Sequence, residues 1–311
     1  MDDTKLLFSD EENKHTERIE RLSAHKRRTV GLLQYANSTK TALTISQKAR
    51  YADCHSFLTF HNYFTLGKIK LSHVEHCDIH LLCPLCAIRR ASKKTILYEK
   101  KVQELLSSNP NLNLYYVVLT VKNEENLSKA YEHLTKAQKT LTQRRRDAQK
   151  FFNTGNKKHL SAANSVFARV EAGAYSIEVK RGKNSGDWHP HTNFVLLSED
   201  DIKKEELINE WRSITGNSFI VHCEKVASRQ DIIKVLVEIF KYAMKFSEME
   251  FSDNLFAWET LKGRRLTGSF GQFRGLDVED DDDGDPVPDG TEYEEIFYRF
   301  FDDKYKKIQK L

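Results

Sequence analysis

The fold of this chain is decided by a hairpin whose second strand reads Trp-His-Pro-His-Thr-Asn-Phe-Val-Leu-Leu, residues 188–197. The run Ile-Glu-Val-Lys, residues 177–180, precedes it, and the polar residues between them, with two glycines, form the expected loop. Because side chains alternate between the faces of a strand, His189, His191 and Asn193 share one face. Glu178, near the end of the partner strand, is expected to come close to the two imidazoles.

The two histidines and Glu178 are candidate ligands of a divalent metal. Two histidines and a carboxylate that converge from neighbouring strands can hold an ion with coordination positions open for substrate. Histidines on such a strand can equally be solvated or hydrogen-bonded without any metal. The rest of the sequence must decide between these two interpretations.

The composition indicates a soluble globular protein of one large domain or two modest ones. The 311 residues are 39% hydrophobic and 30% charged. No apolar run approaches the length of a membrane span, and the first residues, Met-Asp-Asp-Thr-Lys, lack a signal-peptide core. We therefore expect a cytoplasmic protein without a membrane partner.

The net charge of +4 conceals an uneven distribution. Residues 277–295 contain eleven acidic and no basic residues, which leaves 49 basic against 34 acidic residues elsewhere. A basic body with a separate acidic segment indicates a polyanionic partner such as DNA. A solvated surface with a disordered acidic loop is the alternative.

Cysteines cluster near the start of the chain and predict a structural zinc site. Four of the five lie within 33 positions and the fifth, Cys223, stands apart; the four are Cys54, Cys77, Cys83 and Cys86. Without an export signal, such a cluster favours metal over disulfides. Four thiolates suit tetrahedral zinc, although His76 or His80 could replace one, and buried free thiols are the alternative. The helix expected after the Cys-x2-Cys knuckle could meet DNA phosphates through Arg89, Arg90, Lys93 and Lys94.

The pattern predicts five segments: a charged helical lead-in (1–48), the zinc module (49–100), a main α+β domain (101–275), an acidic disordered loop (276–295) and a C-terminal helix (296–311). Within the third, strands are expected at 112–121, 167–179, 188–197 and 219–222, with helices at 124–153, 200–213 and 229–246. The order β-α-β-β-α-β plus a closing helix predicts an α+β, ferredoxin-like antiparallel sheet. Its helices would cover one face and leave the other open for a site. The arginine run 144–146 would be a solvated face or a DNA contact.

The closing helix carries a second candidate constellation. Glu238, Tyr242 and Lys245 follow one another at i, i+4 and i+7 and so share a face. They could be an ordinary exposed triplet. A tyrosine hydroxyl, with a pKa near 10, is a poor nucleophile until a nearby lysine and a metal-polarised phosphate assist it. It could then form a 5′-phosphotyrosine, and Glu238 could activate a water for hydrolysis.

Five motifs in order resemble the rolling-circle replication initiator (Rep) proteins of small bacterial plasmids, in the HUH endonuclease superfamily. The resemblance runs from about Cys54 to Phe273. Its pieces are the cysteine module, the strand 118–123, the start of the metal motif at 188–191, the Glu-x3-Tyr-x2-Lys motif at 238–245, and the stretch 261–273.

The resemblance implies Tyr242 as the nucleophile, Glu238 as the water-activating carboxylate, Lys245 as a helper at the phosphate and His191 as a metal ligand. Family members usually carry His-Pro-His-x-His, whereas this chain has Asn193 at the last position. Either Asn193 coordinates through its amide oxygen, or His189 replaces it from the same face.

The expected function is a replication initiator that nicks one strand of origin DNA, using Mg²⁺ or Mn²⁺, and leaves a 3′-hydroxyl for a host polymerase, with a host helicase as a further partner. The sequence leaves open a transposase or relaxase of the same superfamily, a metal-dependent nuclease without a covalent step, and a non-catalytic zinc-containing DNA-binding protein.

Overall fold

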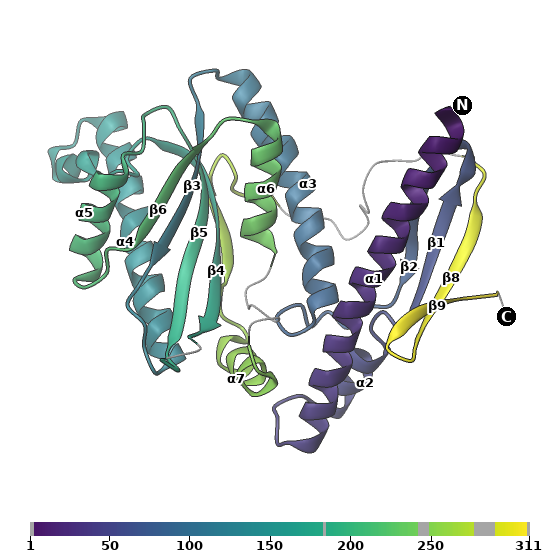
Figure 1. Cartoon of the computed structure of the whole chain (residues 1–311). Helices are drawn as coiled ribbons and strands as arrows, with labels where there is room; N and C mark the ends of the chain where they lie inside the picture. Colours follow the sequence, from purple (N-terminus) through teal and green to yellow (C-terminus); the bar gives the residue numbers. More distant parts are fainter. Residues whose placement is uncertain (1–2, 183–184, 242–248, 277–289, 310–311) are drawn as a thin grey trace. The chain divides into compact units, whose positions relative to one another are not determined.

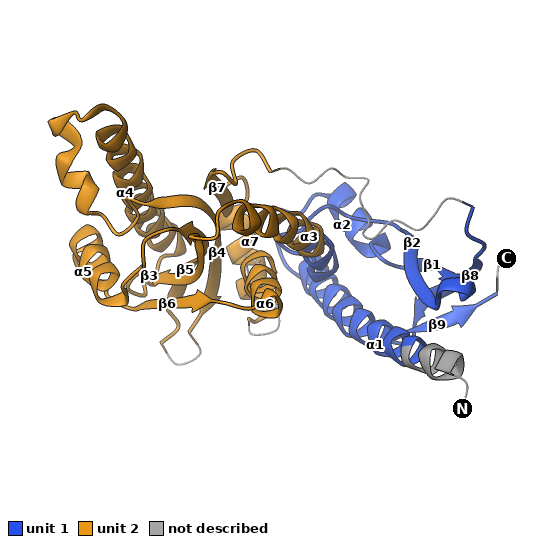
Figure 2. Cartoon of the chain, turned by 90° about the horizontal axis from the view of Figure 1, so that it is seen from above, with its two compact units in different colours: residues 1–89, 283–311 blue, residues 90–282 orange. Residues whose placement is uncertain are grey.

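The computed structural model describes residues 3–182, 185–241, 249–276 and 290–309, with side chains from residue 11 onward. The chain forms two compact units, coloured separately in Figure 2. Unit 1 comprises residues 1–89 and 283–311, and unit 2 comprises residues 90–282. Both ends of the chain therefore belong to the same unit.

Unit 1 is a four-stranded antiparallel sheet with a long helix on one face (Figure 1). Its strands have the order β2-β1-β8-β9, and its elements are α1 (Asp3–Ser38), α2 (Ile45–Asp53), β1 (Phe57–Tyr63), a 3-10 turn η1 (Phe64–Leu66), β2 (Lys68–Val74), β8 (Glu294–Phe301) and β9 (Lys304–Ile308). Leu58, Phe60 and Ile296 pack with Ile19 and Leu22 of α1 into the core of this unit. Burial of this apolar face is the main term that stabilises the sheet.

The predicted C-terminal helix over residues 296–311 is wrong, because β8 and β9 form a hairpin there. Ile296 and Tyr298 alternate with Phe297 and Arg299, and only the even-numbered pair joins the core beneath α1. A period of two is the strand pattern. β8 pairs with β1, more than 230 positions earlier in the chain, and such a partner cannot be read from local sequence. The acidic residues 277–289 lie outside the described residues.

Unit 2 is a five-stranded antiparallel sheet with the order β6-β3-β5-β4-β7. Its elements are α3 (Pro84–Ser108, which begins in unit 1), β3 (Asn113–Thr120), α4 (Leu127–Thr154), a 3-10 helix η2 (Lys157–Asn164), β4 (Val170–Arg181), β5 (Trp188–Ser198), α5 (Lys204–Thr215), β6 (Val221–Val226), α6 (Arg229–Phe240), α7 (Phe251–Leu261) and β7 (Thr267–Gly271). The predicted strands and helices therefore occur in the predicted order, and the α+β class with antiparallel sheets is confirmed.

Helices cover both faces of this sheet, as Figure 1 shows, which corrects the expectation of one open face. On one face, the Thr192 hydroxyl donates to Gln138 Oε1 of α4 over 3.2 Å. On the other, Val195 and Leu197 of β5 share a buried core with Leu236 of α6, together with residues of α3. The apolar stripe of α6 is buried against this face of the sheet, as expected for an amphipathic helix. His189, His191 and Asn193 lie on this α6 side.

The edge strand β7 is joined to β4 by two glycine–aromatic pairs. Gly173 lies opposite Phe270, and Gly268 lies opposite Tyr175. A Cβ placed on Gly173 would lie 2.2 Å from the Phe270 ring, and one on Gly268 would lie 2.6 Å from the Tyr175 hydroxyl. Each ring therefore occupies the space that its partner's missing side chain leaves.

Within the described ranges, no helix is both long enough and apolar enough to pass through a membrane.

Candidate functional site

The β4–β5 hairpin places Glu178 directly opposite His191; the sequence predicts that Glu178 comes close to the two imidazoles but gives no register. The carboxylate oxygen Oε2 lies 3.4 Å from Nε2 of the imidazole. Glu178 is 1% exposed, so this carboxylate is almost removed from water. The next pair on the same face of the sheet is Lys180 with His189, which adds an ammonium to that face.

His191 is held in its neutral form. Burial lowers its pKa to about 4, and the positive charge of Lys180 acts in the same direction, whereas the carboxylate of Glu238 opposes the shift. A neutral imidazole has a lone pair for a metal ion. Its Nδ1 is buried and has no hydrogen-bond partner among the described residues.

His189 is oriented by a residue that the sequence analysis did not single out. Its Nδ1 is hydrogen-bonded to the side-chain oxygen of Asn123, which follows β3. An amide oxygen can only accept, so Nδ1 carries the proton and Nε2 keeps its lone pair. Burial, followed by the nearby His191, lowers the pKa of His189. The two imidazole centroids are 5.8 Å apart.

Asn193 is engaged by a tyrosine. The Tyr116 hydroxyl of β3 donates to Asn193 Oδ1 over 3.0 Å, and Asn193 is only 2% exposed. Burial raises the pKa of Tyr116 to about 12, helped by the carboxylates of Glu238 and Glu224. Tyr116 is therefore a hydrogen-bond donor at neutral pH.

Helix α6 brings Glu238 towards this face. The helix begins after Ser228, whose side chain accepts from the Asp231 amide, and buries Ile232, Leu236 and Ile239. Glu238 forms an ion pair with Lys241, a lysine that the sequence analysis did not select. Leu236 of α6 packs with Val195 of β5 on the face that carries the imidazoles, and the charges of Glu238 and Lys241 act in opposite directions on the pKa of His191. Tyr242 and Lys245 lie outside the described residues, so their predicted placement is untested.

His189, His191 and Glu178 share one face of the sheet, but their ligand atoms do not all lie within 4.8 Å of one another. Among the residues that the structure describes, the four predicted zinc cysteines are the group of His, Cys, Asp or Glu side chains whose ligand atoms all lie within 4.8 Å of one another. The strand register places the first three side chains on one face of the sheet, and the four cysteine sulfurs lie within that distance of one another.

The cysteine cluster has the dimensions of a metal site. Cys54 Sγ lies 3.7 Å from Cys83 Sγ and 3.5 Å from Cys86 Sγ, and Cys77 Sγ lies 3.6 Å from Cys86 Sγ. Four sulfurs at about 2.3 Å from a central zinc would be roughly 3.8 Å apart, whereas a disulfide needs about 2.05 Å. All four cysteines are free and buried. This buried cluster could hold a metal such as zinc.

Helices α1 and α2 complete the surroundings of the cluster. The Lys26 ammonium, 2% exposed, donates to the carbonyl oxygens of Ala52, at 2.8 Å, and Cys54. Burial lowers the pKa of Lys26, and the neighbouring cysteines counter that shift. Thr44 and Gln47 form a capping box at the start of α2, and Cys54 is the C-cap residue at the end of the same helix. A buried ammonium offsets the negative charge that a four-thiolate centre would carry.

The proposed DNA contacts at the start of α3 differ in surroundings. Arg90 is exposed, whereas Arg89, Lys93 and Lys94 are partly buried. Lys94 Nζ donates to Thr267 Oγ1 over 3.2 Å and lies 5.5 Å from the centroid of the Phe240 ring. Lys94 is thus directed towards the last residue of α6.

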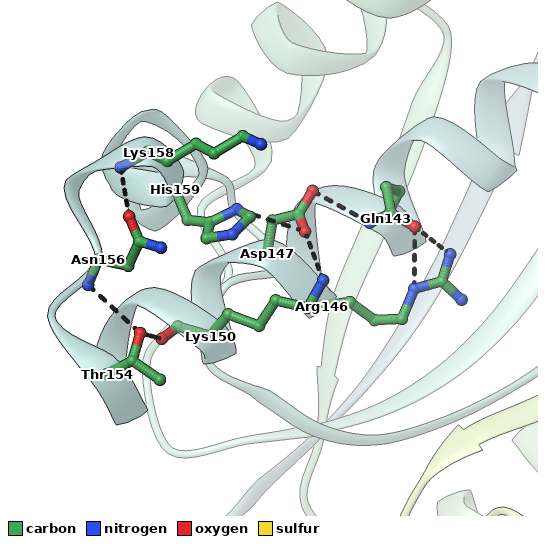
Figure 3. A network of polar contacts seen from close by, with 8 residues as sticks. All are labelled: Gln143, Arg146, Asp147, Lys150, Thr154, Asn156, Lys158 and His159. Carbon is green, nitrogen blue, oxygen red and sulfur yellow. Dashed lines mark hydrogen bonds and ion pairs between the residues drawn. The ribbon is translucent and has the colours of Figure 1, made fainter.

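The arginine run in α4 separates into three roles. Arg145 is 5% exposed and donates to the carbonyl oxygens of Val170 and Glu171, so it is structural. Arg144 pairs with Glu210 at 2.8 Å. Arg146 donates to Gln143 Oε1 within the chain of polar contacts that links α4 to η2 (Figure 3). The run is therefore neither a uniform solvated face nor a free DNA-contact patch.

These features define an α+β protein that combines a buried four-cysteine cluster with a histidine–carboxylate face beside a helix. Comparison with known families matches residues 68–299 to the replication protein family. The match covers well over half of the chain, and the chain belongs to this family. The resemblance to plasmid Rep proteins is thereby confirmed.

One curated relative is "Protein rep" of Staphylococcus aureus. It is 24% identical over 204 residues, which are 63% of this chain and 81% of that protein. No solved structure matches the chain.

Proposed function

We propose that this plasmid replication initiator nicks one strand of origin DNA through a covalent phosphotyrosine. The observation that carries the proposal is the approach of two sets of groups on one sheet face. The Glu178–His191 pair belongs to the hairpin, and Glu238 belongs to the end of α6, four positions before Tyr242. Either set of residues on its own could have a structural role rather than a catalytic one.

The sheet order supports assigning unit 2 as the ferredoxin-like core of an HUH endonuclease. β3, α4, β4, β5, α5 and β6 follow the β-α-β-β-α-β order, and their strands lie side by side as β6-β3-β5-β4. All neighbouring pairs are antiparallel. In this assignment, β7 is an added edge strand, and α6 delivers the catalytic helix to the histidine face.

We propose that Mg²⁺ or Mn²⁺ binds at His191, Glu178 and His189. The donors fit: a neutral imidazole with a buried Nδ1 that lacks a partner among described residues, a nearly buried carboxylate, and a second imidazole held with Nε2 available. Asn193 is better described as a support, because its oxygen already accepts from Tyr116. When bound, the ion would supply positive charge to the scissile phosphate.

The chain's own residues carry the remaining steps of the proposal. The Tyr242 hydroxyl gives its proton to solvent and its oxygen attacks the phosphorus; a bond to the tyrosine forms, and the bond to the 3′-oxygen breaks as that oxygen takes up a proton from solvent. The products are a 5′-phosphotyrosine and a free 3′-hydroxyl, which a host polymerase, with a host helicase, would extend. Lys241 and Lys245 would lower the energy of the phenolate, and Glu238 would later accept a proton from the attacking water.

The cysteine cluster is proposed as a structural zinc site that holds the start of α3. Its four sulfurs suit tetrahedral zinc, and no position is left open for substrate. Arg89, Arg90, Lys93 and Lys94 follow the Cys-x2-Cys knuckle along α3, and some of them could contact origin phosphates. Such contacts make binding fall as salt rises.

A covalent adduct is the decisive readout. The protein is incubated with Mn²⁺ and single-stranded oligonucleotides tiled across the replication region, and the products are separated under denaturing conditions. Wild type should form an adduct and Tyr242→Phe should not. Tyr116→Phe is the matched control, because Tyr116 lies on the same face and donates to Asn193.

The other outcomes identify the rivals. An adduct that survives Tyr242→Phe would reject the nucleophile, and cleavage by wild type without any adduct would indicate a metal-dependent nuclease. Binding without cleavage would indicate a non-catalytic DNA-binding protein. A transposase or relaxase would form the same adduct, so loss of plasmid replication in the Tyr242→Phe strain separates an initiator from these.

A further inference from the structure

The four-stranded sheet of unit 1 has a second face that α1 does not cover. Residues of even number in β1, such as Leu58 and Phe60, pack beneath α1, so the odd-numbered residues point to the opposite side. Pairing across the sheet places Phe57 opposite Arg299, Thr59 opposite Phe297, and His61 opposite Glu295. The same side continues into β9 and β2 through their paired residues.

Aromatic rings are concentrated on this second face. Phe57, Tyr293 and Phe301 are 51%, 48% and 58% exposed, although large apolar side chains usually contribute to cores. His61 is stacked on Tyr293 with ring centroids 3.7 Å apart, and the Tyr63 hydroxyl lies 3.3 Å from His61 Nδ1. This face therefore exposes aromatic rings to solvent, and one pair of rings on it is already stacked.

Positive charges are interleaved with these rings. The Arg299 guanidinium lies 5.3 Å from the centroid of Phe57, and Lys306 Nζ lies 4.7 Å from that of Phe301. The register adds further cations from the neighbouring strands: Lys68 opposite Tyr63, Lys70 opposite His61, and Lys304 opposite Phe301. Two carboxylates lie among them, Glu295 at 3.9 Å from His61 and Asp302 at 2.7 Å from Lys306.

We propose that this face, the aromatic face of unit 1, binds single-stranded DNA by stacking bases on its rings and pairing phosphates with its cations. Rings that alternate with positive charges at strand spacing match the alternation of bases and phosphates along a single strand. A duplex would present its stacked bases only at the ends, so the rings would have no partner. The occupant is therefore a single strand. This site is separate from the proposed nicking site, which belongs to unit 2.

Binding to oligonucleotides of three kinds tests the proposal with the full-length protein. Fluorescence anisotropy measures affinity for a labelled oligothymidylate of about 15 nucleotides, an abasic strand of the same length and charge, and a duplex of the same length. The test variant is Phe57→Ala/Tyr293→Ala/Phe301→Ala, whose three rings are exposed, so that folding should survive. Phe219→Ala removes an exposed ring of unit 2, 53% exposed, as the matched control.

Wild type should prefer oligothymidylate over both other probes. The triple variant should lose about tenfold or more in affinity for oligothymidylate while its affinity for the abasic strand stays unchanged, because stacking on one ring accounts for roughly fivefold to a hundredfold. Phe219→Ala should resemble wild type. Arg299→Gln/Lys306→Gln should weaken both single-stranded probes and reduce the dependence on salt.

Three results would overturn the proposal. The triple variant could bind oligothymidylate as tightly as wild type, or wild type could prefer the duplex. Alternatively, the triple variant could retain oligothymidylate binding but lose self-association in sedimentation experiments, which would make this face an interface between copies of the chain. Tyr242→Phe separates this inference from the proposed nicking activity, because it should abolish the adduct and leave oligothymidylate binding intact.

Discussion

Glu178 and His191 lie directly opposite each other across the β4–β5 pair, with carboxylate Oε2 and imidazole Nε2 3.4 Å apart. With a pKa of about 4, the imidazole is neutral at pH 7, so the contact is not a salt bridge between two charged groups there. A nearly buried carboxylate and a neutral imidazole side by side can instead act as two ligands of a metal cation. The predictions below begin from this pair.

Replacing Glu178 by glutamine should weaken Mn²⁺ binding by about tenfold or more, the size of effect seen when groups around a metal are altered. The substitution keeps the shape of the side chain and removes its charge. Isothermal titration with Mn²⁺ measures the effect. Glu224→Gln is the control, because Glu224 is an exposed carboxylate in the same sheet. Equal Mn²⁺ affinity in Glu178→Gln and wild type would exclude Glu178 as a ligand.

Comparison of His189→Ala with Asn193→Ala should decide which side chain completes the metal site. We expect His189→Ala to reduce Mn²⁺ affinity more, because Asn123 holds its Nε2 available whereas Tyr116 already uses Asn193 Oδ1. Asn193→Ala should instead lower the free energy of unfolding by about 1 kcal/mol, because it removes the acceptor of the partly buried Tyr116 hydroxyl. Metal titration and urea unfolding on both variants measure the two effects. The opposite ranking of affinities would make Asn193 the ligand.

The hairpin and the face that its residues share could be predicted because the pattern is local. A period of two fixes which residues share a face, whereas the pairing between the two strands comes from the structure. His189, His191, Asn193 and Glu178 therefore lie on one face, as expected.

Other features depend on contacts between distant parts of the chain. The β8–β9 hairpin pairs with β1, and its aromatic residues satisfy a helical pattern almost as well as a strand. Coverage of the second sheet face by α6 and α3 depends on how helices pack, which spacing alone does not specify. Asn123 and Lys241 acquire their roles only through neighbours in space, although Asn123 belongs to the stretch 118–123 that resembles a family motif.

Loss of one cluster cysteine should remove the metal and unfold part of the protein. Cys77→Ser is expected to purify without stoichiometric zinc and to lose more than about 3 kcal/mol of stability, because zinc binding in small modules is worth on the order of 10 kcal/mol. Elemental analysis and thermal unfolding measure the two effects. Cys223→Ser, outside the cluster, should keep its zinc. A Cys77→Ser protein with full zinc content would contradict the four-cysteine site.

Stability should fall as the solution becomes more acidic than about pH 6.5. Burial, with the nearby Arg18 charge, lowers the pKa of His15 below its usual value, 6.5. The unfolded chain therefore binds more protons than the folded chain below that pH, and protonation favours unfolding. His15→Gln should make the loss between pH 7.5 and pH 5 smaller, as measured by urea unfolding at each pH. Stability should still depend on pH in this variant, because the pKa values of His25, His189 and His191 are also lowered. If the free energy of unfolding changes with pH equally in His15→Gln and wild type, His15 does not contribute to the pH dependence of stability.

Gly173→Ala should destabilise unit 2, because the new methyl group would lie 2.2 Å from the ring of Phe270. Overpacking of this kind costs about 1–3 kcal/mol. The ring also lies 5.2 Å from the Arg145 guanidinium, which is itself bonded to the backbone at the start of β4, so it has little freedom to move aside. Phe270→Leu should relieve the clash, and the double variant should then be more stable than the sum of the single effects indicates. Urea unfolding of the four proteins completes this cycle. Strictly additive effects would mean that the two side chains do not share the space between β4 and β7.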